Sequence, residues 1–319
     1  MIADIRRDPT LIYERIRFRS PIGVHVFYLD LINFSGGISI HLPTSIECEI
    51  TLSSENKPRG EVEILGMDER FSGIMRQFIE EFLDILGLEL SIKLEVGDSA
   101  IKDLLGMHAL ASLITSTINV LNLALNRPLD YRSLRIVIGN IARNLQTPVS
   151  PLLIDGSLQT SVLYECISIV VKNEVLVSKR IPGEFKAYLI NLEQREQGQR
   201  HVIGEMKNAE LQDKYLKHEI VLMSLYPALI QFNINDIRLS FNNLHFLGSK
   251  FTEILSKGLY KDIIFAKKSL MASDDVLLYA LPTFSSFLIV ISRKDPPIKS
   301  RLIGEYSNVK DNKRVYIVD

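Results

Sequence analysis

Two residues in one strand-like run are of types that support acid–base or electrostatic chemistry. His25 and Asp30 both lie in the stretch IGVHVFYLDL at residues 22–31. A histidine can exchange a proton near neutral pH, and a carboxylate can stabilise a positive charge or hold a magnesium ion. Their separation is odd, so a regular strand would direct them to opposite faces, and they need not act together. The alternative for each is a strand residue that only bonds to a neighbour.

The other histidines and the common catalytic signatures give no support for zinc, serine-hydrolase or Walker-type chemistry. No two of the six histidines have the spacing that places metal ligands on one helical face; they are His25, His41, His108, His201, His218 and His245. The sequence contains no C-x-x-C, H-E-x-x-H, G-x-S-x-G or G-x-x-x-x-G-K-[ST]. No residue is therefore assigned as a metal ligand, and the metal stays unknown.

Length, charge and cysteine usage describe a folded two-domain protein without a strong electrostatic field. The chain has 319 residues, of which 46% are hydrophobic and 24% charged, and its net charge is −1. Such a balance gives no global attraction for nucleic acid. Cys48 and Cys166 lie in apolar runs, which favours buried thiols in a reducing compartment. The first residues contain no apolar signal region, so a cytoplasmic location is expected.

One apolar stretch is long enough to raise the question of a membrane span. Leu104 to Leu125 has 22 residues, as many as the roughly 20 that cross a bilayer require. It also carries His108 and several hydroxyl and amide side chains, which are tolerable inside a protein but costly against lipid. We therefore expect a central, covered helix from about Leu105 to Leu125, and no membrane association.

The elements that would position these residues begin as a sheet. Residues 12–53 read as strands divided at Pro21, at the Gly36–Gly37 pair and at Pro43. After a strand at residues 61–65, apolar residues at helical spacing predict a helix on the sheet: Phe71, Ile74, Met75, Phe78, Phe82 and Ile85. A strand at residues 88–96 then leads to the apolar helix.

Beyond that helix, capping and proline signals place a further helix and a domain boundary. Asp130 can cap a helix over residues 131–143, and Pro148 and Pro151 break the pattern after it. We place the boundary near Gly156, which gives domains at 1–156 and 157–319.

The second domain is predicted as strands followed by helices and closing strands, which favours an α+β class. A helical block covers about residues 202–268 and is interrupted at Pro227. The predicted strands cover residues 161–171, 174–181, 185–192, 276–281 and 286–292, with an edge strand at 314–319.

Several segments, in order, resemble motifs of the archaeal β-ribofuranosylaminobenzene 5′-phosphate synthase family, a branch of the GHMP kinase superfamily. IGVHVFYLDL at 22–31 resembles S-R-I-H-x-x-L-I-D-L, and SGGISIHLPT at 35–44 resembles D-G-G-I-G-I-x-L-x-x-P. The positions that fit are His25, Asp30, Gly36, Gly37 and Pro43.

Later motifs are similar but altered. LLGMHALASL at 104–113 corresponds to G-L-G-S-G-T-Q-L-A-L and keeps Leu105, Gly106 and Leu113. PTFSSF at 282–287 resembles S-S-F-G-P-T, with Ser285 where glycine is expected. Residues 225–248 follow a third family segment loosely, and the resemblance spans about residues 17–292.

The resemblance implies a GHMP-kinase-like α+β fold, with a ribosomal-S5-like domain at 1–156 carrying a degenerate phosphate loop and a ferredoxin-like domain at 157–319. The implied activity moves ribosyl phosphate from phosphoribosyl pyrophosphate to a para-substituted benzoate, with loss of carbon dioxide and pyrophosphate, in a methanopterin-type pathway. Whether the chain is an enzyme stays open. The alternatives are a non-catalytic GHMP-fold binding protein and a GHMP-type kinase that phosphorylates a small alcohol with ATP.

Under the implied activity, the candidate site residues take distinct roles. His25 and Asp30 are the catalytic candidates, and Asp30 could stabilise the sugar cation, hold magnesium or cap a turn. The candidates for binding the phosphate groups are Gly36, Gly37, Gly106, His108, Ser285 and Ser286.

Side chains at the start of the long helix bear on this assignment. Leu104, Met107 and His108 stand where smaller residues would let amide groups approach a phosphate. Either the loop adopts another conformation, or a charged His108 supplements fewer amide contacts, or no nucleotide binds; a buried or capping His108 is an equal alternative. The expected partner is a small phosphorylated molecule, and both magnesium and a homodimer stay open.

Overall fold

The computed structural model describes residues 15–29, 36–53, 61–99, 102, 105–126, 129–191, 220–247, 270–280, 282, 287–296 and 315–318. By its contacts the chain divides into two compact units, Met1–His25 with Ser39–Ser178 and Val26–Ile38 with Lys179–Asp319. Both units combine helices with a sheet, which confirms the α+β class. The proposed boundary at Gly156 stays a prediction; Gly156 itself is the residue before helix α6 (Ser157–Tyr164).

A six-stranded sheet forms the framework of the first unit. Its strands follow the order β3–β4–β2–β5–β6, and β1 pairs with β2. β2 and β4 are antiparallel, with Cys48 opposite Val96, whereas β3 runs parallel to β4. The strands are β1 (Arg15–Tyr28), β2 (Gly36–Ser53), β3 (Val62–Leu65), β4 (Ser91–Val96), β5 (Ile167–Val171) and β6 (Glu174–Lys179).

The predicted breaks at Pro21 and Pro43 are wrong, because β1 and β2 each continue through their proline. β1 pairs with β2 alone among the described strands, so Pro21 can sit on it without removing a bond from a central ladder. Pro43 is exposed and precedes Cys48–Ser53, the part of β2 that pairs with β4.

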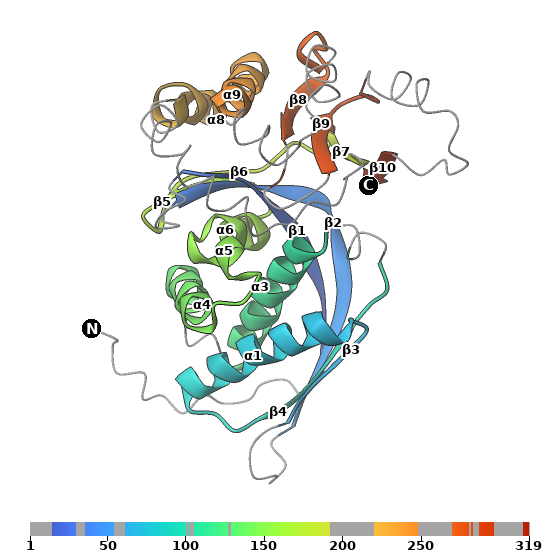
Figure 1. Ribbon diagram of the computed structural model, residues 1–319, viewed down its shortest axis with the longest axis vertical. Helices are drawn as coiled ribbons and strands as arrows, with labels where there is room; N and C mark the ends of the chain where they lie inside the picture. The colour runs from blue at the N-terminus through green and yellow to red at the C-terminus, as the bar shows by residue number, and fades with distance from the viewer. Residues whose placement is uncertain are drawn as a thin grey trace. The chain divides into compact units, whose positions relative to one another are not determined.

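Helices of the first unit gather on one side of this curved sheet (Figure 1). The long apolar helix is α3, and 15 of its 18 residues are buried, which confirms the expected covered core helix. By length and composition α3 could also cross a membrane, but 83% of it is buried among other elements of the unit. The helices are α1 (Glu69–Leu86), α3 (Met107–Ala124), α4 (Tyr131–Leu145), α5 (Ser150–Ile154) and α6 (Ser157–Tyr164).

The predicted cap of α4 and most of the predicted apolar stripe of α1 are observed. The side chain of Asp130 accepts a hydrogen bond from the Ser133 N–H at 2.7 Å, so the predicted N-cap is confirmed. The apolar stripe of α1 is buried as expected at Ile74, Met75, Phe78 and Phe82, whereas Ile85 is 48% exposed.

α6 replaces part of a predicted strand. The sequence predicted a strand from Ser161 onward, yet Ser161–Tyr164 is helical and only Ile167–Val171 is extended. Gly156 adopts φ +79°, which starts the helix, and the Thr160 hydroxyl donates back to the Gly156 carbonyl at 2.7 Å. Packing against α3 overrides the strand preference of Val162 and Tyr164.

In the second unit, a four-stranded antiparallel sheet accompanies the described helices. Its order is β10–β7–β9–β8, so the predicted C-terminal edge strand is confirmed. The strands are β7 (Lys186–Asn191), β8 (Val276–Ala280), β9 (Phe287–Ser292) and β10 (Val315–Val318).

Pro227 does not interrupt the helical block, contrary to the prediction. It lies in the first turn of α8 (Tyr226–Gln231), which follows the π-helical turn η1 (Val221–Leu225) directly. The backbone just before the proline is wider than an α-helix, because the Tyr226 N–H bonds to the Val221 carbonyl five residues earlier. The helix ends instead at Phe232, at φ 53°, before α9 (Ile234–Leu247).

Glycine-to-alanine changes at two positions should alter stability in opposite directions. A Cβ at Gly23 in β1 would lie 2.5 Å from Ser161 Oγ and 2.9 Å from Val162 Cγ2, whereas a Cβ at Gly73 in α1 meets nothing within 4 Å. Gly23→Ala should therefore lower the free energy of unfolding by about 1–3 kcal/mol through overpacking. Gly73→Ala should raise it by about 0.5–1 kcal/mol through helix propensity. Urea titrations of both variants measure this, and equal effects of the two changes would contradict the close approach of β1 to α6.

Candidate functional site

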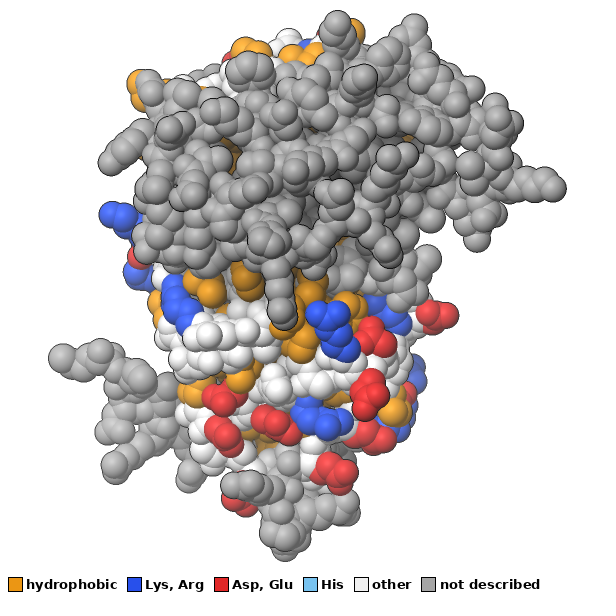
Figure 2. Space-filling model, in the orientation of Figure 1, with side chains coloured by type: hydrophobic (Ala, Val, Ile, Leu, Met, Phe, Trp, Pro, Cys, Tyr) orange, Lys and Arg blue, Asp and Glu red, His pale blue; other side chains and the backbone are white. Residues whose placement is uncertain are grey.

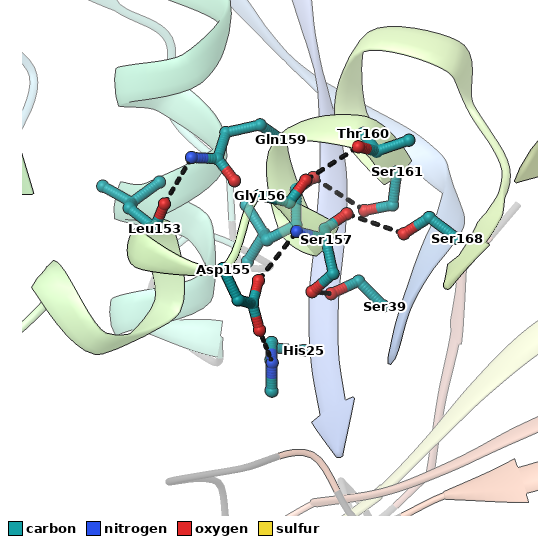
Figure 3. Close-up of polar contacts among 11 residues, drawn as sticks. His25, Ser39, Leu153, Asp155, Gly156, Ser157, Gln159, Thr160, Ser161 and Ser168 are labelled. Carbon is teal, nitrogen blue, oxygen red and sulfur yellow. Dashed lines mark hydrogen bonds and ion pairs between the residues drawn. The ribbon is translucent and has the colours of Figure 1, made fainter. Parts of the chain in front are cut away.

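A buried pair of ionisable side chains lies at the centre of the first unit (Figure 3). His25 Nε2, from β1, is 2.7 Å from Asp155 Oδ2, and neither side chain has any exposed surface. An ionised carboxylate only accepts hydrogen bonds, so with Asp155 ionised the proton of the ring lies on Nε2. The carboxylate thereby fixes both the tautomer and the orientation of the imidazole.

Asp155 is itself held by the turn between α5 and α6. Its Oδ1 accepts from the Ser157 N–H at 2.7 Å, so both of its oxygens are engaged. The Ser157 hydroxyl lies 2.7 Å from the Ser39 hydroxyl of β2, and the Ser168 hydroxyl donates to the Ser157 carbonyl at 2.7 Å (Figure 3). The turn that carries Asp155 is thus bonded to two strands of the sheet.

The first turn of α3 lies close to the same pair. Gly106, the residue before α3, has φ 45° and ψ −106°, and no heavy atom of the described residues lies within 4 Å of the position where a Cβ would be. The first amide groups of a helix have no intrahelical acceptor and can bind an anion there. Leu104, one of the side chains expected to obstruct this end, is outside the described residues, and Met107 is only partly buried.

His108 turns into the protein rather than toward solvent. Its side chain is 1% exposed, and its Nε2 has no hydrogen-bond partner among the described residues. Burial, together with the neighbouring His25, lowers the pKa of His108 to about 3, although hydrogen bonding to the backbone of His25 and Leu105 opposes this. At neutral pH the imidazole is therefore uncharged, so it adds no positive charge to the end of α3.

Small polar residues allow β1 and α3 to approach closely. The Gly23 N–H donates to Ser112 Oγ at 3.0 Å, and the Ser112 hydroxyl donates to the His108 carbonyl at 2.8 Å. One turn further along α3, the hydroxyls of Ser20 and Ser116 are 3.0 Å apart. These contacts fix the register of α3 against the strand that carries His25.

The structure brings together only part of the predicted site. His25 and His108 are neighbours, and Gly106 lies two residues before His108, as the N-cap of α3. Gly36 and Gly37 are buried at the start of β2 and belong to the second unit, which includes Val26–Ile38. Asp30, Ser285 and Ser286 lie outside the described residues.

Asp155 is the residue that sequence reasoning missed. It lies 130 residues from His25 in the sequence, and no local motif links the two. The available signal was an aspartate before a glycine at the start of a run rich in hydroxyl residues, DGSLQTS, which is typical of a capped turn.

The described residues do not fit a magnesium ion at this site. They contain no group of three or more histidine, cysteine or acidic side chains close enough to hold a metal. Both oxygens of Asp155 are already engaged by His25 and by the Ser157 amide. We therefore assign no metal ligand among the described residues of this site.

Thiols and surface charges add no further reactive centre in the described part of the chain. Cys48 and Cys166 are both buried thiols, as predicted, and burial raises the pKa of Cys48 to about 12. On the face drawn in Figure 2, acidic and basic side chains are interspersed rather than separated into areas of one sign.

Comparison with solved structures defines the class of fold to which this arrangement belongs. The chain has the fold of the GHMP kinase superfamily, which confirms the predicted GHMP-kinase-like architecture. No protein-family model and no curated protein sequence matches the chain.

Three solved structures illustrate the likeness. Homoserine kinase from Cytophaga hutchinsonii superposes with a TM-score of 0.62 at 15% identity, over 97% of this chain and 96% of that one. Mevalonate diphosphate decarboxylase from Staphylococcus aureus gives 0.64 at 11%, over 96% and 95%. Mevalonate kinase from Methanococcus jannaschii gives 0.57 at 14%, over 96% and 98%. At these identities the likeness is one of fold.

The buried, neutral His108 should make the protein sensitive to acid. Its folded-state pKa of about 3 lies below the ordinary 6.5, so only the unfolded chain takes up a proton between these values. The contribution of His108 to the free energy of unfolding is fully present above pH 6.5. It falls as the pH decreases toward 3, by up to about 1 kcal/mol per pH unit. In urea titrations from pH 7.5 to 4.5, His108→Gln should show a shallower loss than the wild type. An identical slope in the two proteins would contradict the assignment of this pH dependence to His108.

Proposed function

We propose that the chain binds the phosphate group of a small metabolite at the amino end of α3. Gly106 leaves space in front of this helix, whose first amides and positive dipole end suit an anion. His108 directs its side chain inward, so it does not fill that space. A GHMP-kinase fold is compatible with this role, since the solved structures that it resembles include kinases of small molecules.

For the reaction, we propose transfer of ribosyl phosphate from phosphoribosyl pyrophosphate to a para-substituted benzoate, with loss of carbon dioxide and pyrophosphate. The observation that carries it is the His25–Asp155 pair, because the motif resemblance makes His25 a catalytic candidate and Asp155 holds its ring in one orientation. Asp30, Gly36, Gly37, Ser285 and Ser286 remain proposed site residues. A cytoplasmic location and a methanopterin-type pathway belong to the same proposal.

A second candidate is a non-catalytic binding protein that keeps the fold. It is favoured by the complete burial of both His25 and Asp155, since a side chain must reach its substrate to act on it. In this alternative the pair only stabilises the turn before α6. A kinase using ATP is the third alternative and is supported by the fold of the solved kinases.

Calorimetric titration distinguishes the three alternatives. Under the synthase proposal, phosphoribosyl pyrophosphate and 4-hydroxybenzoate should both give binding heat in the presence of magnesium, and release of carbon dioxide and pyrophosphate should follow when they are mixed. Binding heat with ATP, and none with phosphoribosyl pyrophosphate or 4-hydroxybenzoate, would instead support a kinase. Binding of phosphoribosyl pyrophosphate without product would favour the non-catalytic protein.

A substitution that blocks the amino end of α3 tests the proposed binding location, and a substitution in α1 serves as its control. Gly106→Val places a branched side chain in the space before α3 and disfavours φ 45°, so it should abolish the heat of phosphate-ligand binding. Gly73→Ala, far along the chain in α1, should bind as the wild type does. Undiminished binding by Gly106→Val would contradict the proposed location.

Substitution of Asp155 separates a positioning role from a purely structural one. In Asp155→Asn the amide keeps the shape of the carboxylate but no longer fixes the ring proton of His25, so kcat should fall about 10²–10⁴-fold while KM for phosphoribosyl pyrophosphate changes little. The kinetic constants and the pH profile measure this. A loss of stability with unchanged kcat per folded molecule would leave the pair a structural role only.

A further inference from the structure

A buried guanidinium on α4 has no counter-ion. Arg135 is 7% exposed, and among the described residues its hydrogen bond is the one from Nη1 to the Thr160 hydroxyl of α6, at 3.2 Å. Its Nε, also buried, has no hydrogen-bond partner among the described residues. No carboxylate of the described chain forms an ion pair with it, and Asp155 is engaged by His25 and Ser157.

Glu174, the carboxylate whose charge acts on Arg135, already forms an ion pair with another arginine. Glu174 of β6 forms an ion pair with Arg132, one turn before Arg135 on α4. Glu174 and Tyr164 raise the pKa of Arg135, but burial, the largest effect, and the charge of Arg132 lower it. The local field therefore leaves the buried charge of Arg135 incompletely compensated.

The position of Arg135 relative to α6 adds a second unfavourable effect. Its Nη1 lies 3.4 Å from the position of a Cβ on Gly156, the residue before α6. A cation at this end meets the positive pole of the helix dipole, where an anion is favoured. A guanidinium that is buried, unpaired and at the wrong end of a helix is costly unless an anion joins it.

We propose that Arg135 and the first turn of α6 form a binding site for a small oxyanion, such as a phosphate group. The guanidinium offers parallel N–H donors to two oxygens of such an anion. The Ser157 N–H at the start of α6 is already taken by Asp155, so recognition of the anion rests on the guanidinium. The Thr160 hydroxyl, which already contacts Nη1, holds the guanidinium in place. The site uses α4 and α6 and shares no side chain with the amino end of α3.

Inorganic phosphate is the probe, titrated against sodium chloride at equal ionic strength. In the wild type, the ¹⁵N–¹H resonance of Arg135 Nε should move in a saturable manner as phosphate is added. Arg135→Met should weaken this phosphate binding about 10- to 100-fold, since a hydrogen bond to a charged group contributes about 1.5–3 kcal/mol. Arg143→Met is the matched control, because Arg143 is exposed on the same helix and bonds only to Asn140 among the described residues.

A second readout concerns stability without phosphate. Arg135→Met removes an unpaired buried charge while keeping most of the side-chain volume, so its melting temperature should equal or exceed that of the wild type. Added phosphate should raise the melting temperature of the wild type and of Arg143→Met more than that of Arg135→Met. Phosphate bound at α3 alone would leave the Arg135 Nε resonance unmoved.

Two results would overturn the proposal. One is an Arg135 Nε resonance of the wild type that does not move at any phosphate concentration in the titration. This measurement does not depend on whether a variant folds. The other is unchanged phosphate affinity in Arg135→Met. Failure of the proposed ribosyl transfer would alter neither measurement.

Discussion

The hydrogen-bonded pair of His25 and Asp155 constrains the whole first unit because neither side chain has access to water. A buried carboxylate is tolerated only when its oxygens are bonded, and here one oxygen takes the imidazole and the other takes the Ser157 amide. The second bond requires a sharp turn before α6, which Gly156 supplies at φ +79°. The position of α6 therefore follows from the need to satisfy one side chain of that turn.

The same constraint extends to the sheet and to α3. Hydrogen bonds from the Ser157 hydroxyl and carbonyl reach Ser39 of β2 and Ser168 of β5, so the turn cannot shift without breaking contacts to two strands. Two residues before His25 on β1, the Gly23 N–H bonds to Ser112, and this holds the start of α3 beside His25. Hydroxyl residues are suited to these positions since they satisfy buried backbone groups while occupying little volume.

Prediction from the sequence succeeded where a local signal determined the structure. The apolar stripe of α1, the Asp130 cap and the buried α3 all follow from spacing and side-chain chemistry within a few residues. It failed at Pro21 and Pro227, because the effect of a proline depends on its backbone setting: Pro21 lies in a strand paired only with β2 among the described strands, and Pro227 follows a π-helical turn. Asp155 was also missed, because its role comes from a residue 130 positions away.

Loss of glycines at the start of α3 changes the kind of phosphate recognition that this GHMP fold can support, but it does not exclude recognition. A glycine-rich loop wraps several amides around a phosphate, whereas a bare helix end offers only its first amides and dipole. His108 cannot replace the lost contacts with charge, because burial keeps it neutral, yet its inward orientation leaves the helix end open. Under the proposed function, affinity for a phosphate would come from other groups around the ligand, and the proposed site at Arg135 would add a separate point of anion binding to the same unit.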